Sequence, residues 1–187
     1  MKPGHVYESF GLSDGRDVLL RAISGRDLAE SVRFVNSLVK ERSLDPNFGI
    51  LLDTRVTRRE ERRWLTRTVG GIRKGNVVSV AAFHGGRLVG NCDLHRERSK
   101  DLRHCGEFGI AILKGYRSAG LGRRMLEVLL EESKKAGVTL VELRVLSVNR
   151  RAIRLYRSLG FRRAGSVPGK IIRGRRRIDE VRMFREG

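Results

Sequence analysis

Hydrophobic and polar positions alternate in two periods along the chain, and each period predicts a type of element. Residues 18–23 form an apolar run typical of a strand. Apolar residues three or four apart then predict a helix that starts near Ser24 or Asp27. The sequence Thr57-x-x-Glu60 is a capping-box pattern and predicts the start of a second helix. Runs at 77–84 and 87–95 flank Gly85-Gly86, which predicts a hairpin.

The second half predicts two strand-to-helix units, with strands near residues 107–113 and 139–145. Residues 161–185 read as a closing hairpin around Arg173-Gly174. Residues 45–49, which include Pro46 and Asn47, are expected to break the first helix. Residues 1–17 are expected to be a polar, irregular extension, and residues 18–187 a single domain. The order of strands and helices predicts an α/β fold.

Length and composition fit one soluble domain. A chain of 187 residues can bury one core. Its longest apolar run is far shorter than the roughly 20 residues that span a bilayer. The N-terminus leads into no apolar segment of the secretory kind, and Cys92 and Cys105 are the only cysteines. We expect buried thiols, no disulfide framework, no metal site and a cytoplasmic protein.

The net charge of +19 is concentrated in one part of the chain. Residues 143–178 contain twelve basic residues and no acidic one. The positive potential of such a segment attracts polyanions. Coenzyme A is one candidate, and nucleic acid or a ribosomal surface is another. A solvated basic face is the simplest single explanation of the pattern.

The most informative motif is the glycine turn at residues 117–122, between a predicted strand and a predicted helix. Gly120 and Gly122 let the backbone approach a ligand closely, and the first amides of a helix can bind phosphate. A nucleoside-triphosphate loop is excluded because Leu121 and Gly122 stand where Lys and Ser or Thr are required. A dinucleotide fingerprint is disfavoured by Met125 at its third glycine, although Glu142 lies about 20 residues on, where a ribose-binding acid is expected.

Two motifs together resemble the GNAT superfamily of N-acetyltransferases. The first is Arg117-x-x-Gly120-x-Gly122 before an amphipathic helix. The second is Asn149-x-x-Ala152-x-x-Leu155-Tyr156-x-x-x-Gly160-Phe161, and Asp179-Glu180-x-x-Met183 is similar to the last strand of that fold. The resemblance implies a mixed, mostly antiparallel sheet with helices on both faces, and the use of acetyl-CoA without a metal. It implies that the cofactor contacts Ile110, Ala111, Ile112, Leu113, Arg117, Ser118, Ala119, Gly120, Leu121, Gly122, Arg123, Arg124, Asn149, Ala152 and Tyr156.

The resemblance also implies direct attack by an amine in a ternary complex. Tyr156 would protonate the departing thiolate, although a half-buried core aromatic is the alternative. Glu107 would be the base, by similarity to the spermidine acetyltransferases, or else an ordinary rim carboxylate. The ribosomal-protein alanine acetyltransferases carry a catalytic Glu where this chain has Arg144, a departure from that group.

The acceptor is expected to be an amino group of a protein or a polyamine, with recognition from residues 44–61 and the 168–178 loop. A basic nucleic-acid-binding module on a degenerate acetyltransferase fold is the alternative from another class, and a dinucleotide-dependent oxidoreductase is a third. The sequence leaves the oligomeric state open, a homodimer included.

Overall fold

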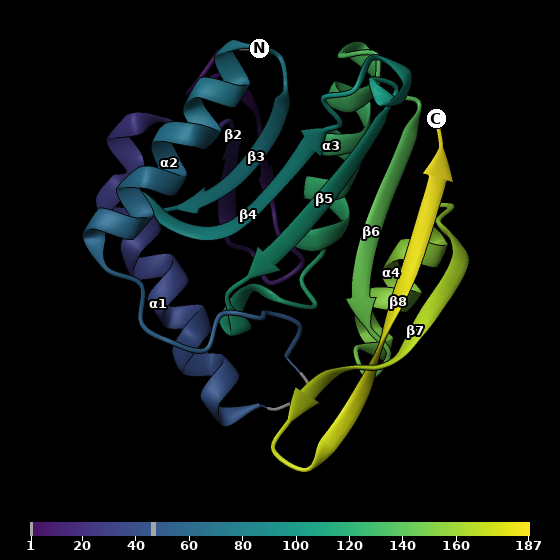
Figure 1. Cartoon of the computed structure of the whole chain (residues 1–187). Coiled ribbons are helices and arrows are strands. Elements are labelled where there is room, and N and C mark those ends of the chain that lie inside the picture. The colour runs from purple at the N-terminus through teal and green to yellow at the C-terminus, as the bar shows by residue number, and fades with distance from the viewer. Residues whose placement is uncertain (1, 46–47) are drawn as a thin grey trace.

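The computed structural model describes residues 2–45 and 48–187, and Figure 1 shows their arrangement. The first half contains β1 (Val6–Gly11), β2 (Asp17–Arg21), α1 (Leu28–Leu44), α2 (Arg58–Arg73), β3 (Val77–His84), β4 (Arg87–Arg96) and β5 (Cys105–Ile112). The second half contains α3 (Leu121–Lys135), β6 (Leu140–Leu146), α4 (Arg150–Ser158), β7 (Arg162–Arg173) and β8 (Arg176–Glu186). Short 3₁₀ turns precede α1, β5 and α3.

The eight strands form one mixed sheet in the order β1-β2-β3-β4-β5-β6-β8-β7. Strands β5 and β6 run parallel, whereas the other neighbouring pairs are antiparallel. The parallel pair needs a crossover connection, which α3 supplies. The predicted α/β fold with a mixed, mostly antiparallel sheet is confirmed.

Each face of the sheet carries its own hydrophobic core. On one face α1 and α2 bury Phe34, Leu38, Leu65 and Ile72 against β3. On the other face α3 and α4 pack against the central strands, and Leu121, Met125, Leu126 and Leu129 are fully buried. The sheet is therefore covered on both sides, as the resemblance to the GNAT superfamily implied (Figure 1).

Local signals in the sequence were reliable guides. The β3–β4 hairpin turns at Gly85-Gly86, where both glycines have positive φ as a two-residue turn requires. Thr57 caps α2, because its hydroxyl accepts a hydrogen bond from the Glu60 amide while the Glu60 carboxylate accepts one from the Thr57 amide at 2.8 Å. The closing hairpin is formed by β7 and β8, and its turn follows Arg173. Cys92 and Cys105 are buried and free.

The N-terminal expectation needs correction. The described part of the segment 1–17 is not an irregular extension, since Val6–Gly11 forms β1 and pairs antiparallel with β2. Tyr7 and Phe10 pack against the core, and the Tyr7 hydroxyl donates a 2.8 Å hydrogen bond to the Ser79 carbonyl. These tertiary contacts outweigh the polar character of the segment. Of the predicted helix break, Pro46 and Asn47 lie outside the described residues, and α1 ends just before, at Leu44.

Within the described ranges, no helix combines the length and apolar character that crossing a bilayer requires.

Candidate functional site

The site is built around a gap between the two parallel strands. Pairing of β5 with β6 covers Cys105 to Glu107 and stops at the Glu107–Glu142 pair, while β5 continues to Ile112. Along that continuation β5 remains bonded to β4 on its other edge. The edge of β5 that faces the gap, which includes Ile110 and Ala111, therefore has backbone groups available to an incoming ligand.

The turn that follows β5 presents a row of unbonded amides. Among the described residues, none accepts a hydrogen bond from the main-chain N–H groups of residues 118–122. Ser118 and Gly120 both have left-handed backbone conformations, with φ of 68° and 88°. Alternation of left- and right-handed residues turns successive N–H groups into one concavity. This turn opens α3, so the positive end of the helix dipole adds to an anion site.

The two glycines of the turn have different roles. A Cβ on Gly120 would meet no atom within 4 Å, so there is room for a side chain at this position. Glycine is required here only because the backbone has a left-handed φ. A Cβ on Gly122 would lie 3.2 Å from Ile112 Cδ1 and 3.5 Å from Leu155 Cδ2. Gly122 therefore allows the start of α3 to pack closely against β5 and α4.

Arg117 holds the turn in place from inside the protein. Its Nε donates a 2.7 Å hydrogen bond to the Ile112 carbonyl, and its guanidinium pairs with Glu41 of α1. The guanidinium also lies 4.3 Å from the centre of the Phe48 ring. Because these contacts occupy the guanidinium, Arg117 shapes the loop.

Arg123 and Arg124 are engaged by protein groups. Arg123 donates a 2.7 Å hydrogen bond to the Ser158 hydroxyl. Arg124 makes two 2.5 Å hydrogen bonds to the Glu8 carboxylate on β1 and a 3.2 Å bond to Glu127. Contact of either arginine with a phosphate of the cofactor stays a prediction. Arg124 would first have to break its hydrogen bonds to Glu8 and Glu127.

Arg151, in the first turn of α4, marks a region of unbalanced positive charge. Burial and repulsion from Arg117 and Arg154 lower the pKa of its guanidinium. The sequence signal for this cluster was the Arg150-Arg151 pair at a helix start, where a cation opposes the helix dipole. An anion bound between the glycine turn and α4 would relieve this repulsion.

Asn149 caps α4. Its Oδ1 accepts a 3.2 Å hydrogen bond from the Ala152 amide, so the structural part of its expected role is present. Its Nδ2 lies 3.2 Å from the position that a Cβ on Gly49 would occupy. Asn149 therefore stands between the start of α4 and the loop that follows α1.

Tyr156 lies on the inner face of α4, beneath β5. Its side chain is 7% exposed, and its ring packs edge-on against Phe108 and Phe161 at centroid distances of 5.8 and 6.0 Å. Burial, together with the nearby Cys92 thiol, raises the pKa of its phenol well above the usual value of 10. With a pKa raised in this direction, the phenol is protonated at neutral pH. Because no described residue forms a hydrogen bond with it, its hydroxyl is available to a ligand.

Glu107 and Arg144 meet at the point where the strands separate. The Arg144 Nε donates a 2.6 Å hydrogen bond to a Glu107 carboxylate oxygen, and both side chains are about half exposed. The carboxylate raises the pKa of Arg144. The residue that departs from the ribosomal-protein group thus holds the carboxylate that was predicted to be the base. Both side chains lie on the face of the sheet that carries α1 and α2.

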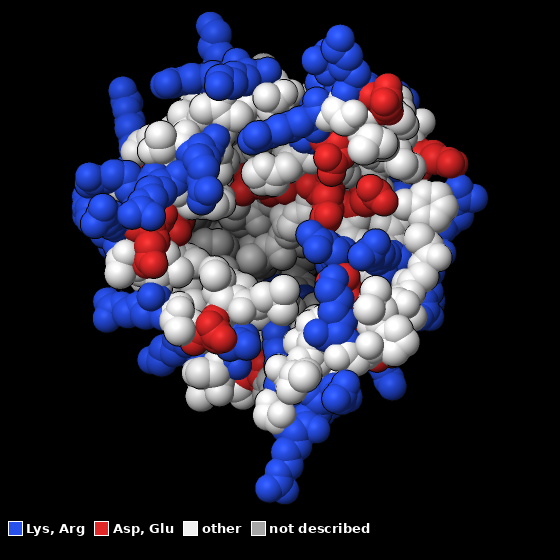
Figure 2. Space-filling view, viewed as in Figure 1, with Lys and Arg blue, Asp and Glu red and all other residues white. Residues whose placement is uncertain are grey.

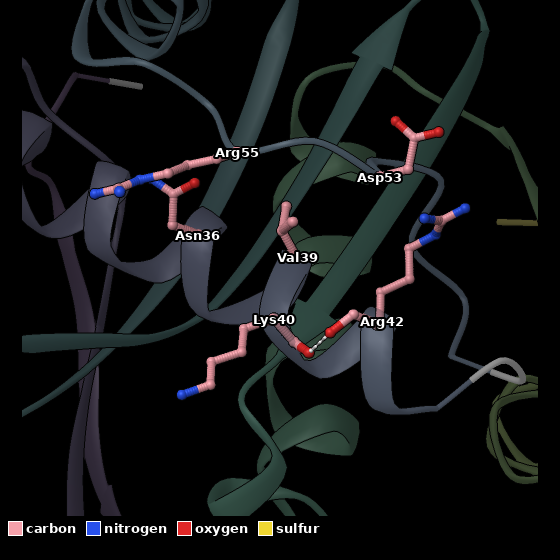
Figure 3. A pocket seen from close by; sticks show the side chains of 7 residues that line it. Asn36, Val39, Lys40, Arg42, Asp53 and Arg55 are labelled. Atoms are coloured by element: carbon pink, nitrogen blue, oxygen red, sulfur yellow. Dashed lines mark hydrogen bonds between the residues drawn. The ribbon is translucent and has the colours of Figure 1, made fainter.

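The two segments expected to recognise the acceptor lie against each other. Arg173 of β7 donates hydrogen bonds of 2.6 and 2.8 Å to the carbonyls of Phe48 and Ile50. Further along the same loop, the Asn36 side chain of α1 exchanges two hydrogen bonds with the backbone of Val56. Figure 3 shows the shallow pocket of about 340 Å³ between α1 and this loop, with Asp53 on the loop and Lys40 and Arg42 on the helix.

Comparison with known proteins identifies the family. The model of the "Acetyltransferase (GNAT) family" matches residues 41–161, which is more than half of the chain. The chain belongs to the GNAT acetyltransferase family. Among the described residues, no group of three or more His, Cys, Asp or Glu side chains could hold a metal ion.

GNAT relatives of known structure match nearly the whole chain. The structure of a GNAT acetyltransferase from Streptococcus pneumoniae is 26% identical, with a TM-score of 0.78, and the match covers 90% of this chain and 98% of that one. That of yncA from Salmonella typhimurium, described with its cofactor acetyl-CoA, is 21% identical over 90% of this chain and 93% of that one, with a TM-score of 0.76. The second likeness shows the shared GNAT fold.

A curated GNAT relative matches a shorter stretch. The ribosomal protein bS18 alanine N-acetyltransferase of Escherichia coli (strain K12) is 47% identical over 57 residues. That stretch covers 30% of this chain and 38% of the relative.

Proposed function

We propose that this chain transfers the acetyl group of acetyl-CoA to a primary amine. The observation that carries the proposal is the row of unbonded amides at residues 118–122, which opens α3 beside the separated strands. Such amides at a helix start suit the diphosphate of coenzyme A. Membership of the GNAT family supports the same cofactor, and a neighbour with this fold is described with acetyl-CoA.

The remaining cofactor contacts follow the path from the turn to the gap. Backbone groups of Ile110 and Ala111, on the free edge of β5, would bond the amides of the pantetheine arm as an added strand would. Ile112 and Leu113, whose carbonyl and amide respectively already have protein partners, would line the path of the arm. Asn149 and Ala152, at the start of α4, would line the other side of the gap. Arg123, Arg124 and the cluster around Arg151 would face the remaining phosphates.

Two side chains would handle the protons of the reaction. The amine nitrogen bonds to the acetyl carbonyl carbon, and the carbon–sulfur bond breaks to release a thiolate. Tyr156 donates its phenolic proton to that sulfur, which is consistent with a phenol kept protonated by burial. A lysine-like amine has a pKa near 10.4, so its proton must also be removed before or during attack. Glu107 takes that proton, after Arg144 releases its carboxylate.

The acceptor is the amino group of a protein or of a polyamine. The relative from Escherichia coli is named for an alanine of ribosomal protein bS18, which supports a protein α-amine as acceptor. Arg144 in place of the catalytic Glu of that group argues for a different geometry at the acceptor nitrogen. Polyamines therefore belong in the same acceptor panel.

A thermal-shift comparison tests the proposal. Acetyl-CoA at 100 times its dissociation constant should stabilise the protein by about 2.7 kcal/mol, or roughly 5–10 °C. NAD and duplex DNA serve as controls, and release of free thiol with peptide and polyamine acceptors measures turnover. A shift with nucleic acid and none with acetyl-CoA would contradict the proposal and favour a nucleic-acid-binding module.

A further inference from the structure

A second cavity lies on the acceptor side of the sheet, next to the proposed cofactor path. It has a volume of about 390 Å³ and lies between α1, α2 and the central strands β4 and β5. Its wall includes Gly109, Ile110 and Ala111, the part of β5 that borders the gap. Figure 2 shows acidic side chains gathered beside a hollow near the middle of this face, within a mostly basic surface.

The cavity has a polar floor made by one face of β4. Asn91, Asp93 and His95 alternate along the strand and all line the cavity. The Asn91 Nδ2 donates a 2.7 Å hydrogen bond to Asp93 Oδ2. The Ser79 hydroxyl, on the neighbouring strand β3, also lies against the Asp93 carboxylate and favours its charged form. The other carboxylate oxygen, Asp93 Oδ1, is enclosed and has no hydrogen-bond partner within standard distance among the described residues, in a residue that is only 7% exposed. A buried carboxylate oxygen of this kind is costly unless a ligand or water bonds it.

Glu61 adds a second carboxylate from α2. It lines the same cavity, is 6% exposed, and accepts a hydrogen bond from the Ser31 hydroxyl of α1. Burial raises the pKa of both carboxyls, and the charge of Asp93 raises that of Glu61 further. Among the described residues that line the cavity, none is Lys or Arg, and His95 is the single basic side chain. A bound cation would therefore stabilise both carboxylates.

Gly109 opens a path from Asp93 to the gap. The two residues are direct partners in the antiparallel β4–β5 ladder, where facing Cβ positions are about 5 Å apart. A Cβ on Gly109 would meet no atom within 4 Å, so the space above it is empty of protein. A ligand nitrogen near Asp93 is thus one strand away from the edge proposed to hold the thioester arm.

The remaining walls are apolar, and Phe34, Trp64 and Leu88 are among them. From this combination we infer that the cavity binds the acceptor as an alkylammonium group, with its charge against Asp93 and Glu61 and its carbon chain against Trp64. Asp93 would then determine specificity for cationic acceptors. The inference rests on the proposed function, because it takes the bound amine to be the group that receives the acetyl. Binding of the amine can nevertheless be measured without turnover.

Trp64 is the single tryptophan of the chain and lines the cavity, so its fluorescence reports occupancy. We expect n-pentylamine, charged at pH 7, to change the fluorescence saturably and to bind at least tenfold more tightly than n-pentanol. Asp93→Asn should remove that preference, whereas Asp101→Asn, in the exposed 3₁₀ turn before β5, should keep it. Equal binding of amine and alcohol by the wild-type chain, or no saturable change with either, would overturn the inference.

Two further arms make the test robust. Gly109→Val should fill the path and weaken n-pentylamine binding, which provides a second variant if Asp93→Asn does not fold. Trialanine amide with a free N-terminus, compared with its N-acetylated form, separates a peptide amine from a small one. Acetyl-CoA binding by calorimetry is measured in parallel. A wild-type chain that binds acetyl-CoA but does not prefer the amine over the alcohol overturns only the cavity inference. A wild-type chain that prefers the amine but does not bind acetyl-CoA overturns only the proposed function.

Discussion

Glu41 and Arg117, 76 residues apart, form an ion pair that joins the last turns of α1 to the turn before α3. The same carboxylate accepts a 2.8 Å hydrogen bond from the Lys114 amide, at the start of that turn. Both side chains are about four-fifths buried. One carboxylate from the acceptor side of the sheet thus holds the loop that is proposed to bind the cofactor.

Replacing Glu41 should therefore weaken cofactor binding from a distance. A hydrogen bond to a charged group contributes about 1.5–3 kcal/mol, so Glu41→Gln should reduce acetyl-CoA affinity roughly tenfold, as measured by calorimetry. Glu131→Gln is the matched control, because Glu131 pairs with Lys135 on the exposed face of α3. An unchanged affinity in Glu41→Gln would mean that the loop keeps its shape without this contact.

Gly120 offers a test of the backbone conformation. A side chain at φ 88° costs about 1–2 kcal/mol, so Gly120→Ala should lower the melting temperature and weaken acetyl-CoA binding severalfold. Gly70→Ala is the control, since Gly70 lies inside α2 with open space around its Cβ position. That change should be neutral or slightly stabilising. Equal effects at the two positions would argue against a required left-handed residue at the start of α3.

Tyr156→Phe separates a proton donor from a packing residue. The phenol makes no hydrogen bond to a described residue, so its removal should leave folding and acetyl-CoA affinity unchanged. Turnover should fall by about 10²-fold or more if the phenol protonates the thiolate. Tyr7→Phe is the control that loses a buried hydrogen bond, to the Ser79 carbonyl, and should lower stability but not turnover. Full activity of Tyr156→Phe in single-turnover experiments would assign the residue to packing alone.

Glu61 should show a pH-dependent cost to stability. Burial raises the pKa of its carboxyl in the folded state above the usual value of 4.5, so folding disfavours the charged form. The cost is absent below the unfolded pKa and complete above the folded one. Glu61→Gln should consequently raise the melting temperature at pH 8, and the gain should disappear near pH 4. A variant less stable than wild type at pH 8 would contradict this sign.

Local chemistry made much of the fold predictable from the sequence. Gly85-Gly86 can adopt the positive φ values of a tight hairpin, and Thr57 and Glu60 cap each other over three residues. The glycine turn before α3 was recognisable for the same reason. These signals depend only on residues that are close in the sequence, so they can be recognised without knowledge of the tertiary structure.

The features that escaped prediction depend on distant partners. The sequence of β1 has only weak strand signals. The strand forms because it pairs with β2 and because Tyr7 and Phe10 pack against the hydrophobic core. The Glu107–Arg144 pair joins strands that are separated by α3. The Asn91–Asp93–His95 alternation was a visible signal, yet only the packing of α1 and α2 over β4 turns it into the floor of a cavity.

The central claim is that main-chain amides at the start of α3 bind the diphosphate of coenzyme A. The most direct measurement is a titration of ¹⁵N-labelled protein with acetyl-CoA, followed in ¹H–¹⁵N NMR spectra and repeated with pantetheine, which lacks the diphosphate. The account predicts large shifts of the amides of residues 118–122 with acetyl-CoA and small ones with pantetheine. Binding of acetyl-CoA that leaves those amides unshifted would contradict it.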